Sequence, residues 1–122
     1  MNMNQVTLAC TDIKASKDFY LTLGFTLIVD TPHYLRFASP NDGASFSLSA
    51  SDHASTGVSV YFETPNVDEC VAELEKKGVT FTHLPEDKRY LWREASLKDP
   101  SGNSLIFYWA GENRLNPPWR VS

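Results

Sequence analysis

The residues of this chain that are best able to do chemistry are three histidines, two cysteines and a few carboxylates within strand-like segments. His33, His53 and His83 lie in different segments and lack the HxH or HxxxH spacing that brings two imidazoles to one metal. They are therefore predicted to be surface or structural side chains. The sequence has no Gly-rich phosphate loop, no GxSxG elbow and no HExxH motif.

The composition places the chain among ordinary globular proteins. A net charge of −4 and a pI near 5.2 argue against general binding to nucleic acid or to an anionic membrane. No apolar run approaches the roughly 20 residues that span a bilayer, and the first residues do not resemble a secretory signal. Cys10 and Cys70 lack CxxC partners and are predicted to be buried thiols, which favours a reducing cytoplasm.

The elements that must position these residues begin with a strand and a helix. Val6 and Leu8 alternate with other residues in QVTLAC, which predicts a strand. Asp12, or Thr11 before it, is the expected N-cap of the next helix, and Gly24 is its expected stop. Three more strands are predicted around 27–29, 34–37 and 46–48, separated by the turn-forming sequences DTPH and SPNDG.

The second half of the chain repeats this order. Asn66 follows Asp12 by 54 residues, and Gly78 follows Gly24 by the same interval. The expected N-cap and stop of a second helix therefore have the same spacing as those of the first helix. Further strands are predicted near 80–83, 90–97 and 104–109. We therefore predict an α+β fold of two tandem βαβββ units, about 4–50 and 57–110, in one domain (1–122) with a concave mixed sheet. The tail, 111–122, is either solvated or docked on its own or a partner chain.

Strand parity selects the side chains that share a face. Ser59, Tyr61 and Glu63 point to one side of their strand, as do Ile106 and Tyr108 of the last strand. Trp92 and Glu94 share a face of the preceding strand; Trp92 is either a wall for a planar ligand or part of the core. The serine row of the fourth strand lines a wet concave surface or is simply exposed, and its residues are Ser45, Ser47 and Ser49. General acid–base work by Glu63 or Glu94 stays open, because spatial neighbours are invisible in the sequence.

Paired βαβββ units, the DFYLTLGF helix and the KDPSGN turn before the last strand resemble the vicinal oxygen chelate superfamily. That superfamily includes glyoxalases, extradiol dioxygenases, fosfomycin-resistance enzymes and bleomycin-resistance proteins. The resemblance covers about Gln5–Trp109, and WREASLKDPSGNSLIF is most similar to bleomycin-resistance proteins. Those proteins bind a drug without a catalytic metal and are typically homodimers, so the resemblance implies a small-molecule ligand and a homodimer.

The resemblance also implies where a metal would lie. Metal-using members take one ligand from each of four strands, usually His or Gln, Glu, His and Glu. The matching positions here are Gln5, Ser47, Ser59 and Ile106. Among these Gln5 alone has a usual ligand type, and the hydrocarbon side chain of Ile106 cannot bind a cation. We therefore expect no metal and no cofactor.

These observations favour a metal-independent protein that binds a small molecule, such as an antibiotic, by sequestration. The candidate ligand-binding residues are Gln5, Ser47, Ser59, Tyr61, Glu63, Trp92, Glu94, Ile106 and Tyr108. Two alternatives stay open at this point. One is a lyase, isomerase or dioxygenase-like enzyme with an atypical or relocated metal, and the other is a non-catalytic subunit or regulatory module.

Overall fold

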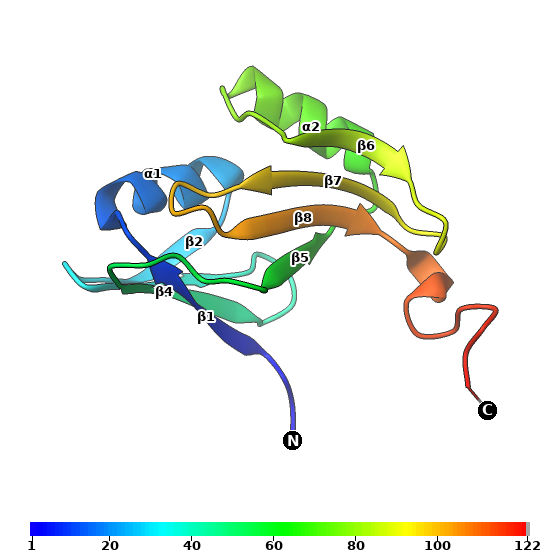
Figure 1. Cartoon of the computed structure of the whole chain (residues 1–122), viewed down its shortest axis with the longest axis horizontal. Coiled ribbons are helices and arrows are strands. Elements are labelled where there is room, and N and C mark those ends of the chain that lie inside the picture. Colours follow the sequence, from blue (N-terminus) through cyan, green and yellow to red (C-terminus); the bar gives the residue numbers. More distant parts are fainter. Residues whose placement is uncertain (122) are drawn as a thin grey trace. The chain divides into compact units, whose positions relative to one another are not determined.

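The repeated strand and helix pattern folds as two four-stranded mixed sheets in the computed structural model, which describes residues 1–121 (Figure 1). Unit 1 consists of Met1–Val58 together with Asp99–Asn103. Unit 2 consists of Ser59–Lys98 and the chain from Ser104 onward. Each unit contains one helix, so the predicted α+β class with two βαβββ units is confirmed.

The first and last strands of unit 1 pair in parallel, a pairing that local sequence could not specify. Its elements are β1 (Gln5–Cys10), α1 (Ile13–Leu23), β2 (Thr26–Asp30), β3 (Tyr34–Ala38) and β4 (Ser45–Ala50). The strand order is β1-β4-β3-β2, with β1 parallel to β4 and the other pairs antiparallel. Asp12 is the N-cap of α1, because its carboxylate accepts the N–H of Ala15 at 3.0 Å. Gly24 ends the helix with φ of +101°, a conformation that favours glycine.

The core of unit 1 lies between α1 and one face of its sheet. Tyr20 is completely buried, and its ring contacts Phe25, Phe37 and Phe46 at centroid distances of 5.0 to 6.3 Å. The Tyr20 hydroxyl donates to Asp99 Oδ2 at 2.6 Å. A buried tyrosine needs such a partner, because an unpaired hydroxyl in an apolar core is costly.

Asp99 organises the DPSGN turn. Its Oδ1 atom accepts the backbone N–H groups of Ser101 and Asn103 at 2.9 and 2.8 Å. The Asn103 amide donates both to Asp99 Oδ2 and to the carbonyl of Ala9. The turn therefore belongs to unit 1, and Asp99, at 4% exposure, is a hub of four donors.

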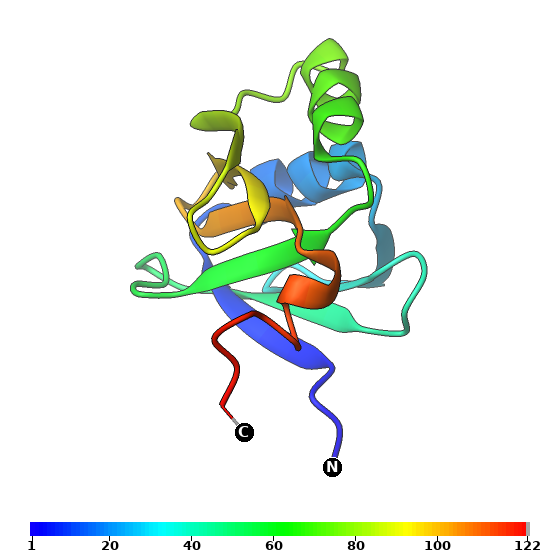
Figure 2. The same cartoon turned by 90° about the vertical axis from the view of Figure 1, so that its right-hand side faces the viewer.

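Unit 2 repeats the arrangement with its own elements. These are β5 (Ser59–Glu63), α2 (Val67–Lys76), β6 (His83–Asp87), β7 (Arg93–Lys98) and β8 (Ser104–Trp109), in the order β5-β8-β7-β6. The expected N-cap Asn66 accepts the N–H of Glu69 at 3.0 Å. Helix α2 covers one face of the sheet (Figure 2), where Val67 and Val71 pack with Ala95.

Two strand boundaries of unit 2 differ from the sequence prediction. The strand expected at 80–83 begins at His83 and runs to Asp87, and the strand expected at 90–97 begins at Arg93. The late start of β7 follows from a hairpin turn after β6, in which Leu91 N–H donates to the carbonyl of Lys88 at 2.9 Å. Leu91 has φ of +70°, a strained conformation for a leucine. No local sequence pattern predicted this turn, because a leucine occupies the position with positive φ.

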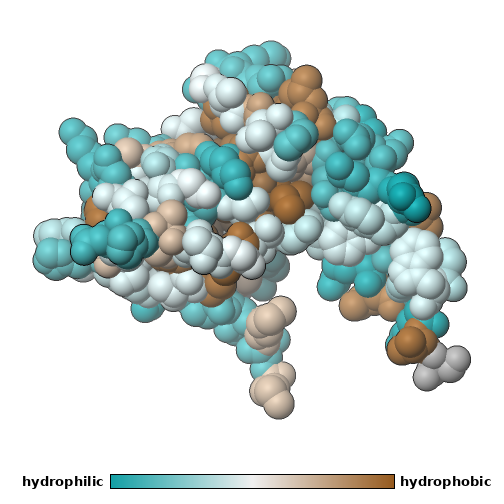
Figure 3. Space-filling view, in the orientation of Figure 1, coloured by the Kyte–Doolittle hydropathy of each residue, from teal (hydrophilic) through white to brown (hydrophobic). Residues whose placement is uncertain are grey.

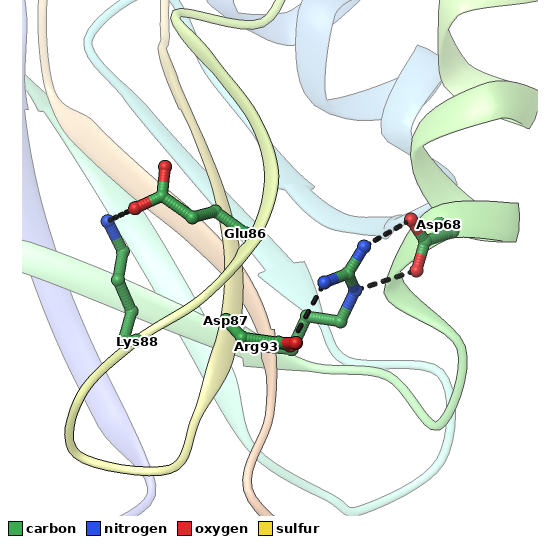
Figure 4. A network of polar contacts seen from close by, with 5 residues as sticks. All are labelled: Asp68, Glu86, Asp87, Lys88 and Arg93. Atoms are coloured by element: carbon green, nitrogen blue, oxygen red, sulfur yellow. Dashed lines mark hydrogen bonds and ion pairs between the residues drawn. The ribbon is translucent and has the colours of Figure 1, made fainter.

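Ion pairs join α2 to two strands of unit 2 (Figure 4). Arg93 donates to both carboxylate oxygens of Asp68, from Nε at 2.8 Å and from Nη2 at 2.7 Å, and its Nη1 donates to Asp87 at 2.9 Å. Nearby, Lys88 pairs with Glu86 at 3.2 Å. Arg93 therefore links the first turn of α2 to strands β6 and β7. The two hydrogen bonds from Arg93 hold the pKa of the Asp68 carboxyl below its usual value.

After β8 the chain forms one turn of 3-10 helix, Gly111–Asn113, and an irregular tail (Figure 2). Leu115 and Trp119 in this tail are 63% and 58% exposed. Docking of the tail on a partner chain stays a prediction. Among the described residues no helix is long and apolar enough to cross a bilayer.

Candidate ligand-binding faces of the two sheets

Four aromatic side chains gather on the face of the unit 2 sheet that α2 does not cover. Trp92 and Tyr108 stack with ring centroids 4.8 Å apart and an interplanar angle of 25°. Tyr61 meets both rings edge-on, at 5.7 Å from Trp92 and 5.5 Å from Tyr108. Tyr90 meets Trp92 edge-on at 5.8 Å. We call Tyr61, Tyr90, Trp92 and Tyr108 the aromatic cluster.

Strand register explains why this cluster forms. Tyr61 of β5 is opposite Ile106 of β8, and Glu94 of β7 is opposite Tyr108. Residues two apart on each strand point to the same side, so Trp92 and Tyr108 meet on the face away from Val67 and Val71. Tyr90 joins from the hairpin turn before β7.

The aromatic cluster is partly exposed. Tyr61 and Tyr90 are 44% and 42% exposed, whereas Tyr108 is 7% exposed. Trp92 packs against the buried group that contains Ile106 and Tyr108, and its indole N–H donates to the carbonyl of Asn113 at 3.3 Å. Trp92 therefore packs against a buried group, and its role as a wall for a planar ligand stays a prediction.

A buried carboxylate lies beside these rings. Glu94 is 8% exposed, and its Oε2 atom accepts the hydroxyl of Tyr90 at 2.7 Å. Within residues 1–121 no lysine, arginine or histidine forms an ion pair with Glu94. Burial raises the pKa of Tyr61, and the charge of Glu94 raises it further. Burial also raises the pKa of Tyr90, and the hydrogen bond from its hydroxyl to Glu94 raises that pKa further.

The other candidates in unit 2 have mixed positions. Ile106 is 8% exposed and contributes only hydrocarbon to this face. Ser59 and Glu63 lie at the two ends of β5 and are exposed. Glu63 is opposite Tyr108 in the register. Burial of Tyr108 is the main cause that raises the pKa of its phenol, and the negative charge of Glu63 raises it further. The face therefore has an aromatic and aliphatic centre with a carboxylate at its edge.

Unit 1 carries a polar network on the face of its sheet away from α1. Arg36 donates from Nε and Nη2 to the hydroxyl oxygen of Tyr34, at 3.1 and 3.0 Å. Tyr34 Oη lies 2.5 Å from Ser47 Oγ, which also accepts the amide N–H of Gln5 at 2.7 Å. Ser45 donates to Gln5 Oε1. We call these five residues the polar network.

The polar network is built by the register of β1, β3 and β4. Arg36 is opposite Ser47, and Gln5 is opposite Ser45, so all of these side chains point to one side. Ser47 is completely buried, and its neighbours Phe46 and Leu48 are buried on the other face of the strand. The hydrogen bond with Ser47 lowers the pKa of Tyr34, and those from Arg36 lower it further.

Sequence reasoning missed three residues of these faces, namely Tyr34, Arg36 and Tyr90. The alternation of Tyr34 and Arg36 with the buried Leu35 and Phe37 was a usable signal for the first two. Tyr90 gave no such signal, because it lies in a turn where strand parity does not apply.

The four positions at which the resemblance implies metal ligands carry an amide, two hydroxyls and a hydrocarbon. Only the amide of Gln5 is a usual ligand there, and no carboxylate or imidazole accompanies it, so this set of side chains is a poor fit to a divalent cation. Within the described part of the chain, no group of three or more His, Cys, Asp or Glu side chains could hold an ion. His33, His53 and His83 are exposed on separate segments.

A sequence profile of known proteins matches residues 2–107, and its description is Glyoxalase/Bleomycin resistance protein/Dioxygenase superfamily. The chain belongs to this superfamily. The resemblance inferred from the DFYLTLGF and KDPSGN motifs is thereby confirmed. No curated protein matches the chain.

Solved structures of the superfamily share the fold at low identity. A glyoxalase/bleomycin resistance protein/dioxygenase from Nocardioides is 22% identical with a TM-score of 0.78, over 100% of this chain and 90% of its own. A bleomycin-binding protein complexed with bleomycin is 18% identical with a TM-score of 0.75, over 88% and 98%. Lactoylglutathione lyase from Agrobacterium tumefaciens is 17% identical with a TM-score of 0.74, over 88% and 92%. One superfamily fold thus supports both drug binding and catalysis.

Proposed function

We propose that this superfamily member is a small-molecule binding protein that uses no metal and acts by sequestering a planar, positively charged aromatic ligand. The observation that carries the proposal is the aromatic cluster of unit 2 beside the buried Glu94. The rings of Tyr61 and Tyr90 remain accessible although they contact other rings. Aromatic side chains offer a large contact area at little cost in conformational entropy.

Glu94 supports the positive charge of the ligand. A carboxylate that is 8% exposed and has one hydroxyl donor, but no cationic partner in the described chain, is not neutralised by the protein. A ligand ammonium beside it would gain from the carboxylate and from the negative faces of the tyrosine and tryptophan rings. Neutral aromatic molecules would gain only the ring contacts.

A panel of paired aromatic compounds tests this proposal. Each pair contains a planar cation and its neutral analogue, bleomycin is included, and binding is measured by thermal shift and tryptophan fluorescence. A ligand at 100 times its Kd stabilises the fold by about 2.7 kcal/mol. We expect cations to bind at least about tenfold more tightly than their neutral analogues.

Variants assign the binding to this face. Glu94→Gln is nearly isosteric and should remove the preference for cations, while Trp92→Leu should weaken both members of a pair. Trp119→Leu, at a 58% exposed tail position, is the matched control and should bind as the parent protein does. Equal binding by the Trp92 variant and the parent would contradict the proposal.

Metal independence has its own measurement. Elemental analysis of the purified protein should find no stoichiometric nickel, zinc, iron or manganese, and these ions should leave its melting temperature unchanged. One tightly held equivalent that is lost in Gln5→Ala would favour the alternative, an enzyme of the superfamily with an atypical metal site. Absence of any ligand for the parent protein would favour a non-catalytic subunit.

The proposal extends to a homodimer in a reducing cytoplasm, as the family resemblance and the unpaired cysteines suggested. Cys10 and Cys70 are both free. Exposed apolar residues form several separate patches on the face shown in Figure 3, so they do not define one partner surface there. Sedimentation analysis of the full chain would measure the oligomeric state directly.

A further inference from the structure

The polar network of unit 1 contains more hydrogen-bond donors than acceptors. The amide of Gln5 has a fixed orientation, because its nitrogen also donates to the carbonyl of Val6 at 3.3 Å. Ser47 Oγ therefore receives an N–H from Gln5 in addition to its contact with Tyr34. Tyr34 and Ser47 have one hydroxyl hydrogen each but share a single hydrogen bond. One of these two hydrogens has no acceptor within residues 1–121.

Arg36 adds a positive charge and further donors. Two of its five guanidinium N–H groups donate to Tyr34, and the others have no protein acceptor in the described chain. Because Nε and Nη2 face the phenol, the free side is the edge formed by Nη1 and Nη2. That edge presents two parallel N–H groups, which match the two oxygens of a carboxylate or phosphate.

Nothing in the described part of unit 1 neutralises this charge. Arg36 forms no ion pair with an aspartate or glutamate, in contrast to Arg93, which binds Asp68 and Asp87. Arg36 is half-buried and lies over the ring of Tyr34, with its central carbon 5.4 Å from the ring centroid. The ring and the hydrogen bonds hold the guanidinium in place, so that little side-chain entropy would be lost when an anion binds.

We propose that the free edge of Arg36, beside the half-buried hydroxyl of Tyr34, binds an anionic oxygen group of a ligand, either a carboxylate or a phosphate. The anion accepts the two N–H groups of the free edge of Arg36, and the bonds from Arg36 to Tyr34 hold that edge in place. This inference concerns unit 1 alone and does not depend on the aromatic ligand proposed for unit 2.

The test uses full-length protein labelled with ¹⁵N and follows the Nε–H resonance of Arg36. The probes are sodium acetate, sodium phosphate and the neutral analogue acetamide, at an ionic strength held constant with sodium chloride. We expect a saturable shift with acetate or phosphate, and binding by acetamide that is at least about tenfold weaker. The anion that binds more tightly, acetate or phosphate, identifies whether the ligand group is a carboxylate or a phosphate. A shift without saturation, or equal binding of acetate and acetamide, would overturn the proposal.

Three variants make the assignment specific, with anion binding followed by the backbone resonances of β3 and β4. Arg36→Gln should weaken binding at least about tenfold, whereas Lys14→Gln, which removes the same charge from an exposed position on α1, should leave it unchanged. Tyr34→Phe retains Arg36 and should weaken binding less, which keeps the test valid if Arg36→Gln does not fold. Retention of full affinity by both the Arg36 and Tyr34 variants would refute the site.

A second readout distinguishes binding from a merely structural role. The bound anion lies beside the phenol and should raise the pKa of Tyr34, which is measured by the ultraviolet absorbance of tyrosinate. No change in this titration at saturating anion would contradict the geometry. Because acetate and phosphate have no ring, these results are independent of the aromatic panel, so either proposal can fail while the other stands.

Discussion

The buried bond between Tyr20 and Asp99 joins the two sequence motifs by which the family was recognised, and it gives the most direct test of the fold. Tyr20 belongs to DFYLTLGF and Asp99 to KDPSGN, 79 residues apart. Tyr20→Phe keeps the ring and its contacts with Phe37 and Phe46, and removes only the hydroxyl. The variant therefore isolates one hydrogen bond to a buried carboxylate.

The expected loss follows from the charge of the acceptor. Asp99 is 4% exposed and retains three other N–H donors, so the variant loses one charge-assisted bond without opening a cavity. Such a bond contributes about 1.5–3 kcal/mol to the free energy of unfolding. For a chain of 122 residues this corresponds to a decrease in melting temperature of about 5–15 °C. Urea and thermal unfolding at neutral pH measure both quantities.

The pH dependence supplies a second and independent check. Burial, and then the charge of Asp99, raises the pKa of Tyr20, so the folded protein keeps this phenol neutral in alkali. In the unfolded chain the phenol ionises near pH 10.0. Above that pH, unfolding releases a proton, and the parent protein loses about 1.4 kcal/mol of stability per pH unit from this group. Tyr20→Phe lacks this effect. The difference in free energy of unfolding between the parent and the variant should therefore shrink as the pH rises above 10.0.

Two results would refute this reasoning. One is a Tyr20→Phe protein that is as stable as the parent at neutral pH, and the other is a stability difference that stays constant into alkali. Asp99→Asn and the double variant complete a thermodynamic cycle, in which we expect a coupling energy of at least about 1 kcal/mol. Additive effects would mean that the two side chains do not interact.

Two further predictions concern unit 2. Arg93→Gln should lower the melting temperature at low salt and much less at high salt, because its carboxylate partners are exposed; an effect independent of salt would contradict an electrostatic role. At the hairpin turn, Leu91→Asn should be tolerated and Leu91→Val should lose about 1 kcal/mol in urea unfolding, because φ of +70° suits asparagine and excludes branched side chains. Equal stability of the two Leu91 variants would show that the strain is absent.

Much of the fold could be predicted because its signals are local. The caps Asp12 and Asn66 and the stop at Gly24 act within one helical turn, and each was recognised from residue type and spacing. Strand alternation likewise placed Ile106 and Tyr108 on one face of the last strand, where they pack in one group. The repeat of 54 residues followed from these same signals.

Only the tertiary structure decided which side chains meet. The contacts of Tyr20 with Asp99 and of Tyr34 with Ser47 depend on strand register and on a long return of the chain, and no short sequence window contains both partners. The turn at Leu91 shifted the predicted start of β7 and brought Tyr90 to Glu94. Residue types and periodicity determine where a side chain points, but hydrogen bonds and ring contacts act over a few ångströms and require the assembled sheet. The aromatic cluster, the unpaired Glu94 and the donor-rich polar network were for that reason visible only in the folded units.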